Sequence, residues 1–94
     1  MSVEKCLLDL FEREKNCVTR INCSEDRIRV LEAEIERMKE AYSPSKWRDR
    51  DIEVTQRCID CEVDAISQVR ADLDNIRDEM REYLERTLKG RLKL

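Results

Sequence analysis

The chain has 94 residues, which is enough for one small domain. Charged residues make up 44% of it, well above the roughly 25% of an average soluble domain, and the 19 basic and 22 acidic side chains nearly balance at a net charge of −3. With one glycine and one proline, the sequence lacks both the frequent turns of a β-sandwich or barrel and the glycine-rich loop of a nucleotide-binding α/β domain. We therefore expect an all-α fold, with residues 1–94 forming a single helical domain.

Residues 3–42 follow a heptad repeat, which predicts a first helix over about 3–42. Ten of the twelve residues at positions a and d are apolar: Leu7, Glu14, Ile21, Ile28, Ile35 and Tyr42 at a, and Val3, Leu10, Cys17, Ser24, Leu31 and Met38 at d. The pattern extends beyond the three or four heptads that indicate a coiled coil. Weak helix formers in residues 16–24 leave open a break near 22–24. The heptad phase continues through them, which favours one continuous helix.

Pro44 predicts the end of the first helix near Tyr42, because the residue before a proline disfavours helical backbone. We expect a loop over about 43–49. The side chains that could cap the start of the second helix are Ser43, Ser45, Asp49 and Asp51. The sequence does not choose among these four.

The second helix is expected over about 50–89, with a basic tail over 90–94. Its seam residues are Ile52, Ile59, Ile66, Leu73, Met80 and Thr87 at a, and Thr55, Glu62, Val69, Ile76, Tyr83 and Gly90 at d. Lys89 followed by Gly90 is typical of a helix end. Five acid-to-base pairs at i,i+4 spacing are expected to support the two helices: Asp9/Arg13, Glu25/Arg29, Glu53/Arg57, Glu82/Arg86 and Glu85/Lys89.

Two apolar seams of similar length joined by a short loop predict an antiparallel two-helix coiled-coil hairpin. If the chain folds about Lys46 or Trp47, facing residues have numbers that add up to about 94, and Ile28 then faces Ile66. A lone hairpin with one seam excludes water poorly. We therefore expect it to assemble into a four-helix bundle or a larger helical oligomer.

Four apolar residues at heptad position e widen the seam: Phe11, Val18, Val63 and Leu84. We predict that they form the contact with a second copy or with another helical protein. This pattern favours a non-enzymatic interaction protein: a coiled-coil scaffold, an adaptor or a small regulatory subunit. The polar residues at seam positions, Glu14, Ser24, Thr55 and Glu62, have two interpretations: they set register or partner choice, or they mark a wet seam.

The five cysteines are an odd number, and we interpret them as free thiols in a reducing, intracellular compartment, cytoplasmic or nuclear. Cys58 and Cys61 form a C-x-x-C motif, but it lies inside a predicted helix with no strand before it and no histidine in the chain. We favour inert thiols over a redox or metal site. Neither a catalytic residue nor a cofactor is predicted, and no apolar run approaches the length of a membrane span.

An alternative function rests on the basic, tryptophan-containing tip of the hairpin. Lys46, Trp47, Arg48 and Arg50 could contact phosphate groups, with the indole stacking on a base. The basic C-terminal tail could add to such a contact. The less specific interpretation is that loop tips and helix ends favour Lys and Arg in any protein, and we prefer it.

Overall fold

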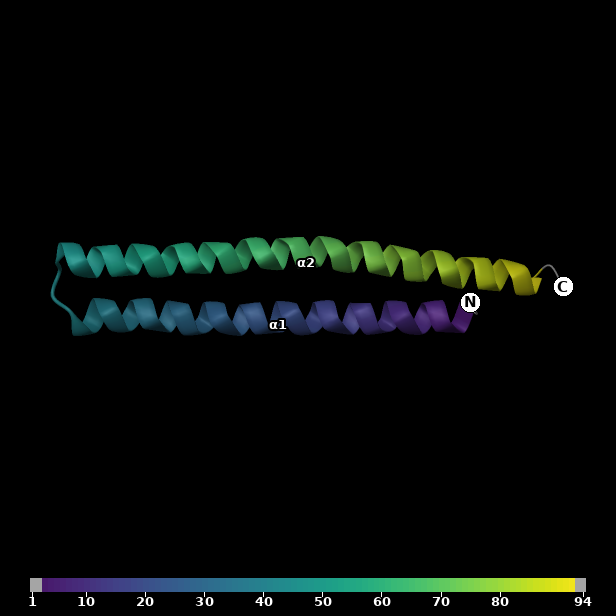
Figure 1. The fold of residues 1–94 in the computed structure, drawn as a ribbon, viewed down its shortest axis with the longest axis horizontal. Coiled ribbons are helices and arrows are strands. Elements are labelled where there is room, and N and C mark those ends of the chain that lie inside the picture. The colour runs from purple at the N-terminus through teal and green to yellow at the C-terminus, as the bar shows by residue number, and fades with distance from the viewer. Residues whose placement is uncertain (1–2, 93–94) are drawn as a thin grey trace.

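The computed structural model describes residues 3–92 and shows two α-helices joined by a short loop (Figure 1). Helix α1 spans Val3–Ala41 and helix α2 spans Lys46–Leu92. They lie side by side and antiparallel in a rod of 75 × 19 × 14 Å. We call the end with the connection the loop end and the opposite end the open end. The expected all-α hairpin is confirmed.

The hydrophobic core is the predicted heptad seam. The buried apolar side chains of the described residues are Leu10, Cys17, Ile21, Ile35, Ile59, Ile66, Val69, Leu73 and Ile76. Each of them occupies a predicted a or d position. The best buried, Leu10 and Ile76, still keep 4% of their surface exposed, because a single seam between two helices leaves both of its edges open. Helix α1 runs through residues 22–24 without a break, as the continuous heptad phase favoured.

Helix α2 begins at Lys46, four residues before the predicted start at about 50. The Oγ of Ser45 accepts a hydrogen bond of 3.1 Å from the backbone N–H of Arg48, and its carbonyl accepts one of 3.0 Å from Asp49. Ser45 is therefore the N-cap among the four candidates. The loop shortens to residues 42–45, because this cap allows Lys46 and Trp47 to join the helix.

The loop is centred on Ser43 and Pro44 instead of Lys46 or Trp47. Residue numbers paired across the helices add up to 89 for Arg27–Glu62, 92 for Arg13–Glu79 and 95 for Glu25–Arg70. The expected sum of about 94 lies within this range.

The predicted stop at Lys89 and Gly90 was also wrong. Helix α2 continues through Gly90 to Leu92, and no described residue has a positive φ. A glycine ends a helix by taking up the left-handed conformation, and Gly90 keeps helical backbone instead. Residues 93–94 of the predicted basic tail lie outside the described residues. Within the described chain, neither helix contains an apolar stretch long enough to cross a membrane.

Candidate interaction surface

The seam leaves two long edges where the helices meet, and cross-helix ion pairs show which residues share each edge. Glu25 and Arg70, both at heptad position e, pair at 3.4 Å. Arg13 and Glu79, both at position g, pair at 3.8 Å. The described side chains of the e edge are Glu4, Phe11, Val18, Glu25, Glu32 and Lys39 on α1 and Asp49, Gln56, Val63, Arg70, Arg77 and Leu84 on α2. The g edge lies on the other side of the seam.

All four predicted interface residues lie on the e edge and are partly exposed. The exposed fractions are 48% for Phe11, 38% for Val18, 46% for Val63 and 49% for Leu84. At the open end, Leu8 and Leu88 extend this apolar surface from the neighbouring b positions, with 66% and 58% exposed. The structure thus brings the predicted residues to one edge of one rod. It contains a single chain, so their role in a contact stays a prediction.

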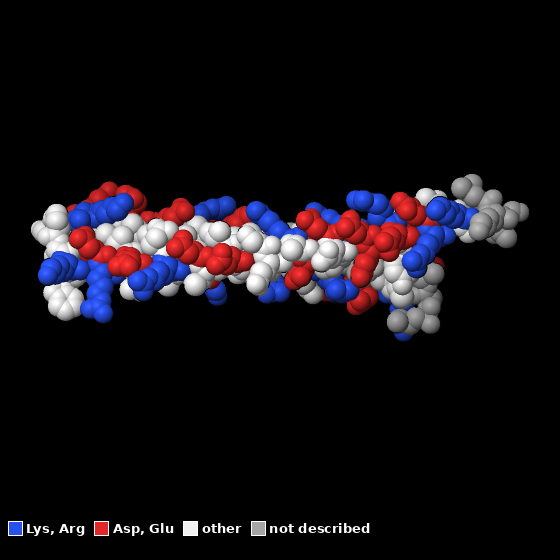
Figure 2. Space-filling model, turned by 90° about the horizontal axis from the view of Figure 1, so that it is seen from above, with Lys and Arg blue, Asp and Glu red and all other residues white. Residues whose placement is uncertain are grey.

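The charges along the e edge and its adjoining b positions are unequally distributed. The half toward the open end carries the cations Lys15, Arg77 and Arg81 and the anions Glu4 and Asp74. The half toward the loop end carries the anions Glu32, Glu36, Asp49, Glu53 and Asp60 and the cations Arg29, Lys39 and Lys46. Side chains of both signs cover the rod along its length, with uncharged surface between them (Figure 2).

The polar seam residues are paired across the two helices. The Arg27 guanidinium donates a hydrogen bond of 3.1 Å to the Glu62 carboxylate, whose side chain is 19% exposed. Hydrogen bonds from the Ser24 hydroxyl and from Arg27 lower the pKa of Glu62 below its usual range. Arg77 donates across the seam to Glu14 at 3.2 Å. These contacts satisfy the carboxylates of both acidic seam residues across the two helices.

Thr55 behaves differently from the other polar seam residues. Its hydroxyl donates a hydrogen bond of 2.9 Å to the carbonyl of Asp51, within its own helix. The hydroxyl of Thr55 is therefore satisfied within α2.

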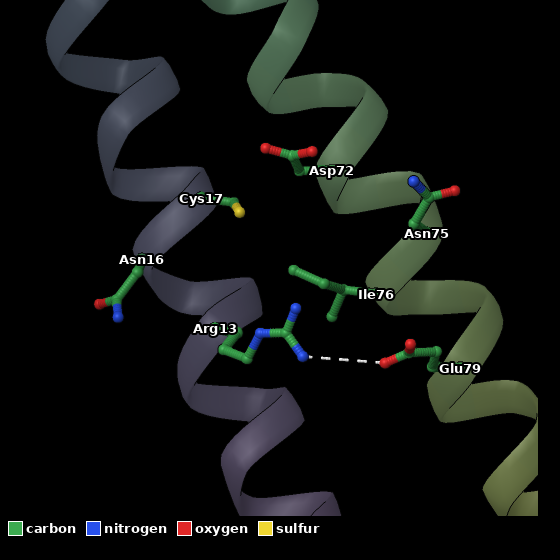
Figure 3. A pocket seen from close by; sticks show the side chains of 7 residues that line it. All are labelled: Arg13, Asn16, Cys17, Asp72, Asn75, Ile76 and Glu79. Carbon is green, nitrogen blue, oxygen red and sulfur yellow. Dashed lines mark ion pairs between the residues drawn. The ribbon is translucent and has the colours of Figure 1, made fainter.

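A groove on the g edge has a volume of about 530 Å³. Figure 3 shows Cys17 and Ile76 pointing between the helices and Arg13 reaching across to Glu79. Its full lining is Arg13, Asn16, Cys17, Asp72, Asn75, Ile76 and Glu79. The side chains of Arg13 and Glu79 are 53% and 57% exposed, so their ion pair is a solvated one that bridges the helices.

Three residues of the predicted basic tip are exposed, and the fourth, Arg48, packs against the end of α1. Trp47 is 75% exposed, and Lys46 and Arg50 are also exposed. The side chain of Arg48 is only 19% exposed, and it donates a hydrogen bond of 3.3 Å to the carbonyl of Tyr42 at the end of α1. Arg48 thus stabilises the C-terminus of α1. The position of Arg48 just after the loop could have indicated this role from the sequence.

The cysteines have separate environments. Cys17 is buried in the seam as predicted, whereas Cys23, Cys58 and Cys61 are exposed. The half-buried Cys6 shares a hydrogen bond with the hydroxyl of Tyr83, which raises the pKa of Tyr83. In residues 3–92, no three Cys, Asp or Glu side chains gather closely enough to hold a metal ion.

Comparison with protein families, with curated proteins and with solved structures gave no match for this chain. The function must therefore be argued from the exposed surfaces of the hairpin.

Proposed function

We propose that this protein is a helical assembly module that associates through its e edge, with a second hairpin completing a four-helix bundle. The observation that supports this proposal is the alignment of four half-exposed apolar side chains, Phe11, Val18, Val63 and Leu84, along one edge of the rod. A scaffold, an adaptor and a regulatory subunit would each use this same contact.

The energetics favour covering this edge. Burial of a large apolar side chain contributes about 1.5–3 kcal/mol relative to leaving it exposed. Each of the four residues already has part of its surface covered by the seam, so a second hairpin gains the remainder. Helix pairs that pack in this way use an a/d/e face, which is the face that this sequence presents.

The double variant Phe11→Glu/Leu84→Glu tests this proposal. A charge at each of the two positions makes covering the edge unfavourable, while both side chains remain solvated in the isolated hairpin. We expect the variant to sediment as a monomer in analytical ultracentrifugation and to keep its helical circular dichroism. The wild-type chain is expected to sediment as a dimer or a higher oligomer.

The matched control is Val30→Glu/Val54→Glu. Val30 and Val54 are 62% and 52% exposed but occupy c positions, away from the e edge. This variant should keep the wild-type mass. Equal masses for the wild type and the Phe11→Glu/Leu84→Glu variant would contradict the proposal.

A second candidate function rests on the 75% exposure of Trp47 at the loop end. An exposed indole flanked by Lys46 and Arg50 is suited to stacking on a base of single-stranded nucleic acid. This function predicts binding that weakens as salt concentration rises and that is lost in Trp47→Ala/Arg50→Ala. Binding to an oligonucleotide that is unchanged in this variant would contradict it.

A further inference from the structure

A second copy can cover the e edge in two symmetric ways, and these bring different helices together. Closed two-fold dimers are the commonest homo-oligomers. With the two-fold axis along the rod, both loop ends point the same way, and α1 of each copy packs on α2 of the other. With the axis across the rod, the copies run in opposite directions, so that α1 packs on α1 and α2 packs on α2.

The axis along the rod fixes the register between the copies, because a rotation about it moves no residue along the rod. Residues that are level within one chain are therefore also level between the two chains. The Glu25–Arg70 ion pair of 3.4 Å marks one such level on the e edge. Since e positions recur every heptad, seven residues forward in α1 and seven backward in α2 mark the next level.

The levels along the e edge bring no like charges of neighbouring helices together. From the open end to the loop end, the residues of α1 and their neighbours on α2 of the second copy are Phe11 with Leu84, Val18 with Arg77, Glu25 with Arg70, Glu32 with Val63 and Lys39 with Gln56. The two-fold axis repeats each of these contacts on the other side.

The level at the open end is apolar on both chains. Phe11 and Leu84 are 48% and 49% exposed in the single hairpin, and the two copies place all of these side chains in one layer. Leu8 and Leu88, which are 66% and 58% exposed on the adjoining b positions, come within one residue of level and extend it. This layer removes from water the largest apolar side chains of the e edge.

The Glu25–Arg70 level becomes a ring of alternating charge. Within each chain the two side chains already form an ion pair. The second copy places its Arg70 on the other side of Glu25 and its Glu25 on the other side of Arg70. Each carboxylate then has a guanidinium on both sides, and charges in this order favour one orientation of two surfaces over others.

The outer rim of this contact, formed by the b positions, is less complementary. Lys15 comes within one residue of level with Arg81 of the second copy, and Glu36 does so with Asp60. All four side chains are exposed in the hairpin and stay on the solvent side of the bundle, where screening keeps like-charge contacts weak. The levels of the e edge therefore decide the orientation.

The arrangement with the axis across the rod can slide, but its central offsets match poorly. Phe11 then meets an e residue of the second α1. As the axis moves from the level of Val18 to that of Glu25, this residue is Glu25, Glu32 or Lys39 and never an apolar one. With the axis at the Glu25–Arg70 level, Glu25 meets Glu25 of the second copy, and Arg70 meets Arg70.

We propose that the occupant of the e edge is a second copy of this chain, related by a two-fold axis along the rod, so that both loop ends lie at the same end of a four-helix bundle. This inference rests on the proposed function, since it specifies the partner and its orientation.

The first test is amine crosslinking of the wild-type protein with a short reagent, followed by mass spectrometry of its peptides. Lys46 is exposed at the start of α2, at the loop end, and a Lys46–Lys46 link can only join two chains. We expect this link, because both loop ends lie at the same end of the bundle. In the opposite orientation the two Lys46 side chains lie near opposite ends of a 75 Å rod, too far apart to be joined.

The second test reverses charges in the Glu25–Arg70 ring. Glu25→Arg or Arg70→Glu alone places like charges at two symmetric contacts between the copies, and each should raise the dimer Kd roughly threefold to tenfold. The double variant Glu25→Arg/Arg70→Glu restores the alternation and should recover the wild-type Kd. Circular dichroism checks that all three variants keep their helices.

Arg13→Glu is the matched control for these variants. It breaks the Arg13–Glu79 ion pair, which also joins the two helices of one chain but lies on the g edge. Its dimer Kd should equal that of the wild type, because the g edge faces away from the second copy.

The possible results separate the orientation from association itself. A dimer that gives no Lys46–Lys46 link, or a double variant that binds no more tightly than the single variants, would overturn the orientation and leave association through the e edge intact. A strictly monomeric wild-type chain would overturn both.

Discussion

Glu62 is the residue whose environment differs most from the one its heptad position suggests. A carboxylate at position d normally weakens a seam, but here the Ser24 hydroxyl and the Arg27 guanidinium both hydrogen-bond to it. The sequence identified Glu62 as a polar seam residue. It could not name Arg27 as the partner, because that choice depends on the register and on the reach of a long side chain from the other helix.

Glu62→Gln should lower the midpoint of thermal unfolding at pH 7 by a few degrees. The pKa of Glu62 is lower in the folded chain than in the unfolded one. Its ionised carboxylate therefore stabilises the fold above the ordinary carboxyl pKa, and this contribution is lost as the pH falls through the folded value. The difference between Glu62→Gln and the wild type should accordingly shrink in acid.

Glu40→Gln is the matched control, because Glu40 is exposed on the outer side of α1. Its unfolding midpoint should follow that of the wild type at every pH. A Glu62→Gln deficit that persists unchanged at low pH would show that the carboxylate charge is not the stabilising feature.

At the scale of the helices, their existence, type and core positions could be predicted, whereas their ends could not. The heptad pattern marks the a and d positions over many residues, and the buried side chains follow it. An end depends on a single cap, and the sequence offers four candidates for α2. Ion pairs predicted from i,i+4 spacing can also be replaced by other contacts. Glu25 was expected to pair with Arg29, but Glu25 pairs with Arg70 and Arg29 pairs with Asp26.

Ser45→Ala should destabilise the hairpin by about 0.5–2 kcal/mol, because the backbone N–H of Arg48 loses its acceptor. Urea unfolding followed by circular dichroism measures this free energy. Ser43→Ala provides the control, since Ser43 lies in the same loop outside both helices. Equal unfolding free energies for the two variants would show that α2 does not depend on this cap.

Gly90→Ala should stabilise α2 by up to about 1 kcal/mol, because alanine restricts the unfolded chain and favours helix. Gly90 has helical backbone, and a Cβ atom added there meets nothing within 4 Å. The gain should appear as slower amide hydrogen exchange near the end of α2. Destabilisation by this change would mean that Gly90 ends the helix in solution, as the sequence suggested.

At the scale of the whole molecule, the rod is long and thin, and its seam buries side chains on one face of each helix only. The sequence predicted both this shape and the apolar residues left along the e edge. It could not name the ion pairs between the helices, such as Glu25–Arg70, because these depend on the observed register.

The most direct test is the absolute mass in solution, measured by light scattering after size exclusion under reducing conditions. We predict a discrete species of twice the chain mass of 11.3 kDa. A stable, fully helical species at the chain mass itself, unchanged as the protein is concentrated, would contradict self-assembly through the e edge.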